Sequence, residues 1–233
     1  MPSTHNPSAT DEVAEPKAAP SARSREEEKI NTLTHALGAA LSVVGFELLL
    51  ARATHLGDSW QLVGCAVYAS SLVAVYAAST LSHSFQRPRL RRFFRILDQA
   101  FIFLLIAGTF TPISLTYLRG GPWWFLFGLM WAIAMFGFVS KTIFAHQIES
   151  VSTALHITMG WLPVLALKPM LTLLPGGLIW SMLYGGLCYT GGTFFLMRDH
   201  RVRHFHAIWH LLVIAGSAFH YWGIYWYCTA APA

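Results

Sequence analysis

Residues 60–83 read WQLVGCAVYASSLVAVYAASTLSH, a run of 24 residues without Asp, Glu, Lys or Arg. An α-helix of about 20 apolar residues crosses the roughly 30 Å hydrocarbon core of a bilayer. Other apolar stretches of similar length occur along the chain. The sequence therefore predicts an all-α, polytopic integral membrane protein with seven transmembrane helices, at about 33–51, 60–83, 97–117, 123–143, 151–171, 175–197 and 204–227.

The composition of the whole chain supports membrane residence. Hydrophobic residues make up 55% of the 233 residues and charged residues only 12%, whereas soluble domains carry about 25% charged residues. Ten of the charged residues lie in the first thirty. The rest of the chain has too few charges to cover a water-facing surface, which argues against a soluble enzyme, a disordered chain and a nucleic-acid-binding protein.

Residues 1–30 differ from the rest of the chain. They are rich in Ala, Ser, Pro and Glu and contain no apolar run, so they cannot bury enough surface to offset chain entropy. They also lack the apolar core of a secretory signal. We expect a disordered cytoplasmic tail at 1–30 and a seven-helix membrane domain at 31–233.

The distribution of basic residues predicts the orientation, because cytoplasmic loops of membrane proteins carry an excess of Lys and Arg. With the N-terminus inside and the C-terminus outside, only Arg52, Arg119 and Lys168 fall on the outer face. The other thirteen fall on the inner face: Lys17, Arg23, Arg25, Lys29, Arg87, Arg89, Arg91, Arg92, Arg95, Lys141, Arg198, Arg201 and Arg203. We therefore expect a multi-pass protein of the cell's inner membrane with a cytoplasmic N-terminus.

Four ionisable side chains meet at one depth in this topology. His83 ends the second span, Asp98 opens the third, and His206 and His210 open the seventh. All four then lie within about two helical turns of the cytoplasmic face. Because ionisable groups are costly inside a membrane, such residues are candidates for function.

The spacing of these residues favours a metal site. His206 and His210 are four residues apart and therefore share one helix face, as do Ser79 and His83. Three neutral imidazoles with one open position form the ligand set of a catalytic zinc, whose bound water has a pKa of about 7. Asp98 could accept a proton from that water or steer a substrate. Ser79 could donate a hydrogen bond to an oxyanion or orient the water.

Other interpretations of the histidines stay open. His206 and His210 could be interfacial, or could form a cytoplasmic pH sensor with His200 and His204. A single histidine such as His83 is common at a helix end. The shared depth favours the metal site over these alternatives, because unpaired polar groups are costly there.

Further polar residues within the spans have less defined roles. His35 and His156 lie in the inner half, where we expect a structural hydrogen bond for each. The fourth zinc position remains open between water, Asp98, His35 and His156. His220 lies ten residues beyond His210, about 15 Å along the helix, so we expect a separate polar contact for it. Glu47, in the outer half of the first span, is either paired or interfacial.

Four segments in order resemble the hemolysin III family, whose relatives include the adiponectin and progestin receptors and, more distantly, the alkaline ceramidases. Together they cover residues 31–225. The segments are Asn31-Thr-Leu-Thr-His35 with Gly38, Ser79-Thr-Leu-Ser-His83, Leu97-Asp98 followed by Ile106-Ala-Gly-Thr-Phe-Thr-Pro112, and His206-Ala-Ile-Trp-His210 followed by Gly216-Ser217 and His220.

The resemblance implies a seven-helix fold with a cytoplasmic N-terminus and a zinc ion near the inner face. The ion would be held by His83, His206 and His210, with Ser79 and Asp98 beside a zinc-bound water. The eukaryotic relatives imply hydrolysis of a lipid amide, and by analogy of the site we expect a zinc-dependent hydrolase acting on a lipid amide or ester.

The alternative function is non-enzymatic: a membrane-homeostasis or sensor protein, or a cytolysin, with a structural zinc. In either case the expected partners are membrane lipids, with the tail and basic loops offering a surface for anionic lipids or a protein partner. No nucleic-acid partner is expected. The sequence does not indicate an oligomeric state.

Overall fold

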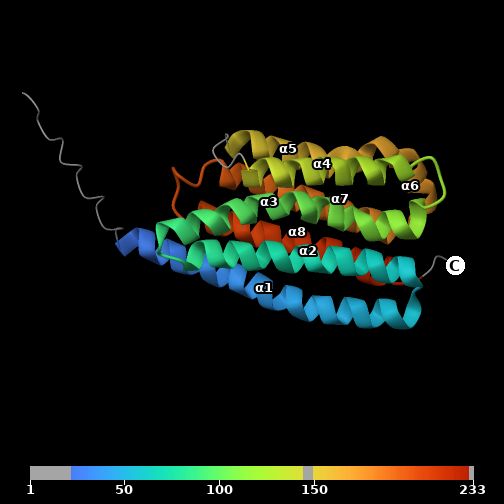
Figure 1. The fold of residues 1–233 in the computed structure, drawn as a ribbon, viewed down its shortest axis with the longest axis horizontal. Coiled ribbons are helices and arrows are strands. Elements are labelled where there is room, and N and C mark those ends of the chain that lie inside the picture. The colour runs from blue at the N-terminus through green and yellow to red at the C-terminus, as the bar shows by residue number, and fades with distance from the viewer. Residues whose placement is uncertain (1–21, 144–148, 231–233) are drawn as a thin grey trace, which may run out of the picture.

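The computed structural model describes residues 22–143 and 149–230, and every regular element in these ranges is helical (Figure 1). The elements in chain order are α1 (Ala22–Leu56), α2 (Ser59–Ser84), α3 (Pro88–Ile113), the π-helical turn η1 (Ser114–Leu118), α4 (Trp124–Ile143), α5 (Glu149–Trp161), the 3₁₀ segment η2 (Leu162–Ala166), α6 (Leu167–Leu173), α7 (Gly176–Leu196) and α8 (Phe205–Tyr227).

These elements form seven long helical segments, which confirms the predicted fold class. The fifth is broken: α5, η2 and α6 follow one another as a single segment interrupted near Pro163 and Pro169. Six of the seven contain a stretch of residues long and apolar enough to cross a membrane. The other, α7, is 21 residues long, and its six glycines dilute its apolar character.

Local sequence explains where α2 and α3 begin. Asp58 caps α2 by accepting hydrogen bonds from the backbone N–H groups of Trp60 and Gln61, at 2.6 and 3.3 Å. The Gln61 side chain accepts in return from the Asp58 N–H at 3.0 Å, which completes a capping box. Pro88 is the first residue of α3, where its missing N–H removes no helical hydrogen bond.

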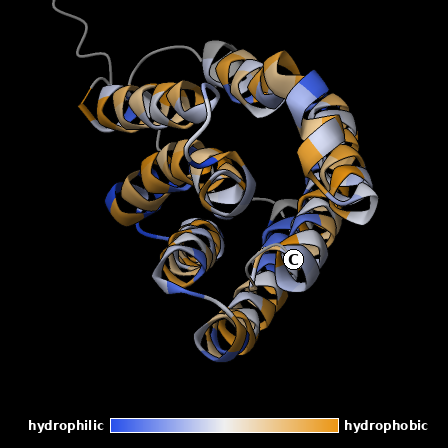
Figure 2. Ribbon diagram, turned by 90° about the vertical axis from the view of Figure 1, so that its right-hand side faces the viewer, coloured by the Kyte–Doolittle hydropathy of each residue, from blue (hydrophilic) through white to orange (hydrophobic). Residues whose placement is uncertain are grey.

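The helices run side by side along the long axis of the molecule (Figure 1). Their packing closes a ring in which α1 contacts α2, α2 contacts α3, α3 contacts α5, α5 contacts α7, α7 contacts α8, and α8 returns to α1, with α4 packed on α3. Viewed along the bundle, hydrophobic residues cover much of the helices (Figure 2). Large apolar side chains such as Phe136 and Leu33 are 75% and 72% exposed, as expected for lipid-facing positions.

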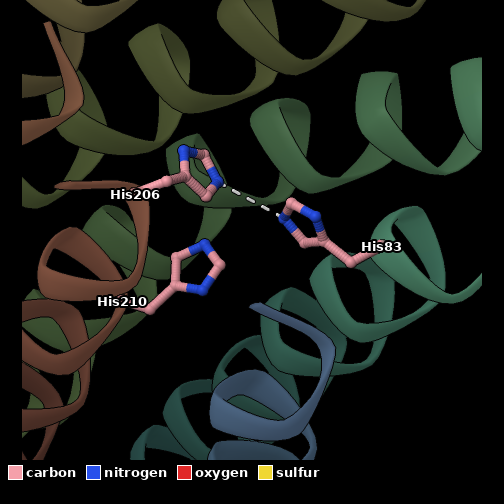
Figure 3. Close-up of side chains that lie close together, drawn as sticks. All are labelled: His83, His206 and His210. Atoms are coloured by element: carbon pink, nitrogen blue, oxygen red, sulfur yellow. Dashed lines mark hydrogen bonds between the residues drawn. The ribbon is translucent and has the colours of Figure 1, made fainter. Parts of the chain in front are cut away.

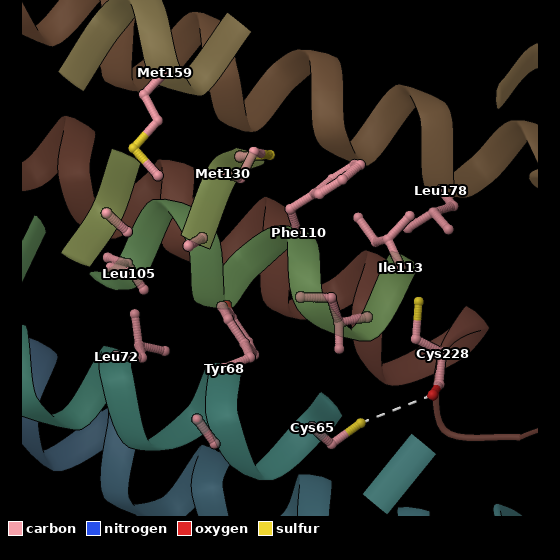
Figure 4. Packing of buried hydrophobic residues seen from close by; sticks show 14 of the residues in the cluster. Cys65, Tyr68, Leu72, Leu105, Phe110, Ile113, Met130, Met159, Leu178 and Cys228 are labelled. Carbon is pink, nitrogen blue, oxygen red and sulfur yellow. Dashed lines mark hydrogen bonds between the residues drawn. The ribbon is translucent and has the colours of Figure 1, made fainter. Parts of the chain in front are cut away.

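The interior is a continuous apolar cluster (Figure 4). Tyr68 and Leu72 of α2 point towards α3, where Leu105 lies next to Leu72, whereas Phe110 of α3 points away from α2, to the side on which Met130 of α4 lies. Helices α2 and α3 approach closely at Gly64, where a Cβ atom would lie 2.8 Å from Cα of Pro112. A small residue at this crossing lets the two backbones pack closely, as is common between helices in membranes.

The prediction of a disordered tail was wrong over residues 22–30, because helix α1 begins at Ala22. This segment, ARSREEEKI, is composed mostly of good helix formers. Its acidic side chains have partners on other elements: Arg203 donates to Glu26 at 3.0 Å and lies 3.4 Å from a Glu27 oxygen. Residues 1–21 of the predicted tail lie outside the described residues.

The chain enters and leaves the bundle at opposite ends (Figure 1), as an odd number of spans requires. The start of α1, the α2–α3 connection and the α7–α8 connection share one end, which we call the arginine-rich end because Arg87, Arg89, Arg91, Arg92, Arg198, Arg201 and Arg203 lie there. Which side of a membrane this end faces stays a prediction.

Candidate metal centre

Three histidines from two helices converge at the arginine-rich end of the bundle (Figure 3). His83 lies in the last turn of α2, and His206 and His210 lie in the first two turns of α8. Each offers a ring nitrogen, and these three atoms all lie within 4.8 Å of one another. The structure thus brings together the three predicted ligands, which could hold a metal ion.

The spacing of two of these nitrogens matches a tetrahedral metal site. Nε2 of His206 and Nε2 of His83 are 3.4 Å apart. Two nitrogens bound tetrahedrally to one zinc ion at about 2.0–2.1 Å would be separated by roughly 3.4 Å. The two atoms therefore already lie at the separation that a shared ion requires.

The opposite ring nitrogens of two histidines contact carboxylates. Nδ1 of His83 lies 2.8 Å from Oε2 of Glu28, and Nδ1 of His206 lies 2.7 Å from Oδ2 of Asp199. A carboxylate can only accept, so each Nδ1 carries the proton and each Nε2 presents a lone pair when the ring is neutral. The hydrogen bond from His206 lowers the pKa of the Asp199 carboxyl, which keeps it ionised.

A hydroxyl group orients the third histidine. Oγ1 of Thr34 lies 3.1 Å from Nδ1 of His210 and donates to the backbone carbonyls of Ile30 and Asn31, at 3.0 and 2.9 Å. Since its hydrogen is engaged by these carbonyls, the hydroxyl accepts from His210. The proton of His210 is thereby assigned to Nδ1, as in the other two histidines.

The donor set fits a cation. With all three Nδ1 atoms protonated, Nε2 of His83 and Nε2 of His206 face each other as two acceptors at 3.4 Å, and they cannot hydrogen-bond to each other. A cation between them converts this unfavourable contact into two bonds. In metal-binding histidines, the N–H group of the second ring nitrogen commonly donates a hydrogen bond to a carboxylate or another acceptor, which fixes the orientation of the ring.

Asp98 and Ser79 lie together beside the histidines. Ser79 is on α2, one turn before His83, and Asp98 is on α3. The Ser79 hydroxyl hydrogen-bonds to the Asp98 carboxyl, and His206 is near enough to interact with that carboxyl electrostatically. Ser79 is 2% exposed and Asp98 is partly buried, so the Ser79 hydroxyl is shielded from the surroundings of the bundle.

The other histidines lie outside the ligand group, which comprises three residues in the described part of the chain. The His35 ring is 3.7 Å from that of His210, centroid to centroid, and both its nitrogens are buried without a hydrogen-bond partner. His156 packs on Phe103 at 4.1 Å. His220 stacks on Tyr189 at 5.6 Å, in agreement with a separate contact within the bundle.

Sequence reasoning missed Glu28, Asp199 and Thr34. One signal was available for Glu28: it lies seven residues, or two helical turns, before His35 and therefore on the same helix face. For Thr34, the sequence offers only its position next to His35. Asp199 lies in the irregular α7–α8 connection, where no periodicity predicts the direction of a side chain.

Three consecutive glutamates join the start of α1 to the rest of the site. Glu26 and Glu27 pair with Arg203 of the α7–α8 connection. Glu28 pairs with Arg91 of α3 as well as with His83. We call Glu26–Glu28 the acidic clamp, since it contacts α2, α3 and the segment leading into α8.

Replacing Glu28 with glutamine is expected to weaken metal binding by about 10–100-fold, the usual effect of losing the hydrogen-bond partner of a metal-binding histidine. The amide keeps the size of the side chain but removes the negative charge next to His83. Zinc affinity should be measured by chelator competition on the purified full chain. Glu26→Gln is the matched control, because Glu26 contacts Arg203 and no histidine; equal affinities for the two variants would contradict the assignment.

The fold and this site define a class of protein: a seven-helix membrane protein with a three-histidine cluster near one end of the bundle. The family model described as "Haemolysin-III related" matches residues 23–221. The chain therefore belongs to the hemolysin III family.

Individual relatives agree with this assignment. The chain is 38% identical over 202 residues to "Hemolysin-3" of Bacillus cereus, covering 87% of this chain and 92% of that protein. It is 33% identical to "Hemolysin-3 homolog" of Bacillus subtilis (strain 168), covering 89% and 97%. It is also 30% identical to human "Monocyte to macrophage differentiation factor", covering 88% and 86%. No solved structure matches the chain significantly.

Proposed function

We propose that this protein is a zinc-dependent hydrolase that cleaves a lipid amide or ester at the arginine-rich end of the bundle. The observation that carries the proposal is the convergence of three histidine nitrogens next to the Asp98–Ser79 pair. Three protein ligands leave a fourth tetrahedral position free, which is typical of catalytic rather than structural zinc sites.

Zinc is the metal we infer, because neutral imidazoles at tetrahedral spacing are common zinc ligands. When bound, zinc would polarise a substrate carbonyl and acidify a coordinated water to a pKa of about 7. Nε2 of His83, His206 and His210 would hold it. Glu28, Asp199 and Thr34 keep these rings in the required tautomer through their Nδ1 atoms.

Asp98 would accept the proton of the attacking water and pass it to the leaving group. The Ser79 hydroxyl donates to the Asp98 carboxyl and so fixes the direction in which the carboxyl points. With its hydrogen engaged in this way, Ser79 acts by positioning Asp98. This role differs from the two that the sequence suggests for Ser79, which are donation to an oxyanion and orientation of the water.

The depth of the site supports a lipid substrate. His206 and His210 lie in the first two turns of α8, close to the level at which a spanning helix leaves the hydrocarbon. The amide and ester bonds of lipids lie at this boundary between acyl chains and headgroups. A lipid could therefore present its carbonyl to the site without leaving the membrane.

We also propose that the arginine-rich end faces the cytoplasm, with the protein in the cell's inner membrane. The basic residues gathered at that end support the orientation through the positive-inside rule. A reporter fused after Cys228 should then be accessible only from outside the cytoplasm.

The test of the hydrolase proposal is an assay of the purified full chain in lipid vesicles for zinc content and for release of fatty acid from a panel of lipid amides and esters. We expect about one zinc per chain and activity on at least one lipid. Activity should be lost when zinc is stripped with a chelator and should return when zinc is added back. A zinc-replete protein that is inert towards the whole panel would falsify the hydrolase and leave the metal site intact.

The second candidate is a non-enzymatic protein, such as a cytolysin or a membrane-homeostasis or sensor protein, in which zinc is structural. The likeness to a protein whose name is "Hemolysin-3" favours the cytolysin among these. Leakage of dye from vesicles separates the two candidates. Leakage that persists in zinc-bound Asp98→Asn would support the cytolysin.

A further inference from the structure

One arginine lies beside the candidate metal centre. Arg95 of α3 is exposed and lies three residues before Asp98, which places both residues on the same face of the helix. Its guanidinium is near enough to interact electrostatically with the Asp98 carboxyl and with the His83 ring. A permanent positive charge therefore stands next to the groups that would carry out hydrolysis.

No acidic side chain neutralises this charge in the described part of the chain. Within residues 22–143 and 149–230, Arg95 forms no hydrogen bond and no ion pair. The carboxyl of Asp98 accepts from Ser79 instead, and Glu28 pairs with Arg91. The N–H donors of the Arg95 guanidinium thus remain available to a ligand.

Arg95 lies at the level expected for lipid headgroups. The predicted third span begins at residue 97, so Arg95 lies just outside it and Asp98 just inside. Along the helix the two are separated by about 4.5 Å, at 1.5 Å per residue, with Arg95 nearer the end of the bundle. In a diacyl phospholipid, the phosphate is attached to the glycerol carbon next to one that carries an ester. A lipid with that ester at the metal centre would therefore hold its phosphate near Arg95.

We propose that Arg95 binds the phosphate of the substrate's headgroup, so that the protein acts on phospholipids in preference to neutral lipids. This inference rests on the proposed hydrolase and names its substrate class. A guanidinium suits the task because its planar N–H groups can donate to two phosphate oxygens at once. Arg95 would then set specificity by holding the headgroup, while Asp98 and the histidines act on the carbonyl.

Arg89 provides the comparison that separates this role from a general effect of positive charge. It is also an exposed arginine of α3, but it lies six residues before Arg95, about 9 Å farther from the site along the helix. Both arginines favour the predicted orientation and attract anionic lipids to the surface. Of the two, Arg95 is the one that interacts with Asp98 and His83.

The first test measures binding without turnover. Dialkyl ether analogues of phosphatidic acid and of diacylglycerol differ only in the phosphate and contain no ester or amide bond. Equilibrium binding of each labelled lipid to the purified full chain, in micelles of a neutral detergent, gives the preference for phosphate. The wild type should bind the phosphatidic acid analogue about tenfold more tightly, as expected for charge-assisted hydrogen bonds.

Three variants locate the preference. Arg95→Gln should lose it, Arg95→Lys should keep part of it, and Arg89→Gln should retain it. Unchanged zinc content would show that each variant is folded. The inference would be overturned by equal binding of the two lipids to the wild type, by an equal loss in Arg95→Gln and Arg89→Gln, or by inorganic phosphate binding as tightly as the phosphatidic acid analogue.

Hydrolysis provides an independent readout. Where the wild type cleaves a phospholipid, Arg95→Gln should raise KM about tenfold and leave kcat nearly unchanged, because the headgroup contact exists before and during the reaction. A large fall in kcat at constant KM would contradict a role in headgroup binding. If the wild type binds the phosphatidic acid analogue through Arg95 but hydrolyses no lipid, the hydrolase is wrong and the phospholipid site stands.

Discussion

Replacing His210 with alanine is expected to abolish stoichiometric zinc binding. Structural zinc sites with four ligands bind with about 10–16 kcal/mol, so each ligand contributes about 3 kcal/mol. The loss of one of three histidines should therefore weaken binding by about a hundredfold or more. Zinc per chain can be measured by elemental analysis after gel filtration, together with the affinity from chelator competition.

The control for this variant is His200→Ala. His200 lies in the α7–α8 connection with a side chain that is 63% exposed, and it does not belong to the three-histidine group. Its removal should leave zinc content unchanged. If His210→Ala kept a full equivalent of tightly bound zinc while remaining folded, the assignment of His83, His206 and His210 as the ligands would be wrong.

Replacing Asp98 with asparagine is expected to lower the rate of lipid hydrolysis by about 10²–10⁴-fold, the usual contribution of a general acid–base group. The amide has nearly the same size but cannot accept the proton of the attacking water. Zinc affinity should change little, because the three histidines and their partners remain. The measurement is kcat on the best lipid found for the wild type, alongside zinc content.

Ser79→Ala provides the comparison. It removes one hydrogen bond to the Asp98 carboxyl and should reduce kcat by about tenfold, since such a bond contributes roughly 1–1.5 kcal/mol. The order expected is therefore a large loss for Asp98→Asn and a smaller one for Ser79→Ala. Full activity in zinc-loaded Asp98→Asn would exclude Asp98 as the proton acceptor.

The transmembrane helices could be predicted from sequence because each must contain enough apolar residues to cross a fixed thickness. The run at 60–83 corresponds to α2 at Ser59–Ser84, and the predicted division between the fifth and sixth spans is present at Leu174 and Pro175. The grouping of the three histidines followed from the same rule. Once the spans alternate in direction, residues at the ends of the second and seventh must share a level.

The residues that hydrogen-bond to the histidines were harder to predict, because they lie where the thickness of the membrane imposes no sequence pattern. Glu28 lies on the charged extension of α1, whose helix is stabilised by contacts with Arg91, Arg203 and His83. These contacts join positions more than fifty residues apart, and composition alone favours disorder there. The direction of the Asp199 side chain is set by a loop that includes His204 at a positive φ of 65°. Sequence periodicity does not reveal such a local geometry.

The acidic clamp has a practical consequence for how this protein is prepared. Hydropathy alone suggests that a shortened chain could start at about residue 31 and retain all seven spans. Such a truncation would delete Glu26–Glu28, leaving Arg91 and Arg203 without these partners and His83 free to rotate. It could insert and fold yet bind metal poorly, so an inactive shortened preparation would say little about the natural protein.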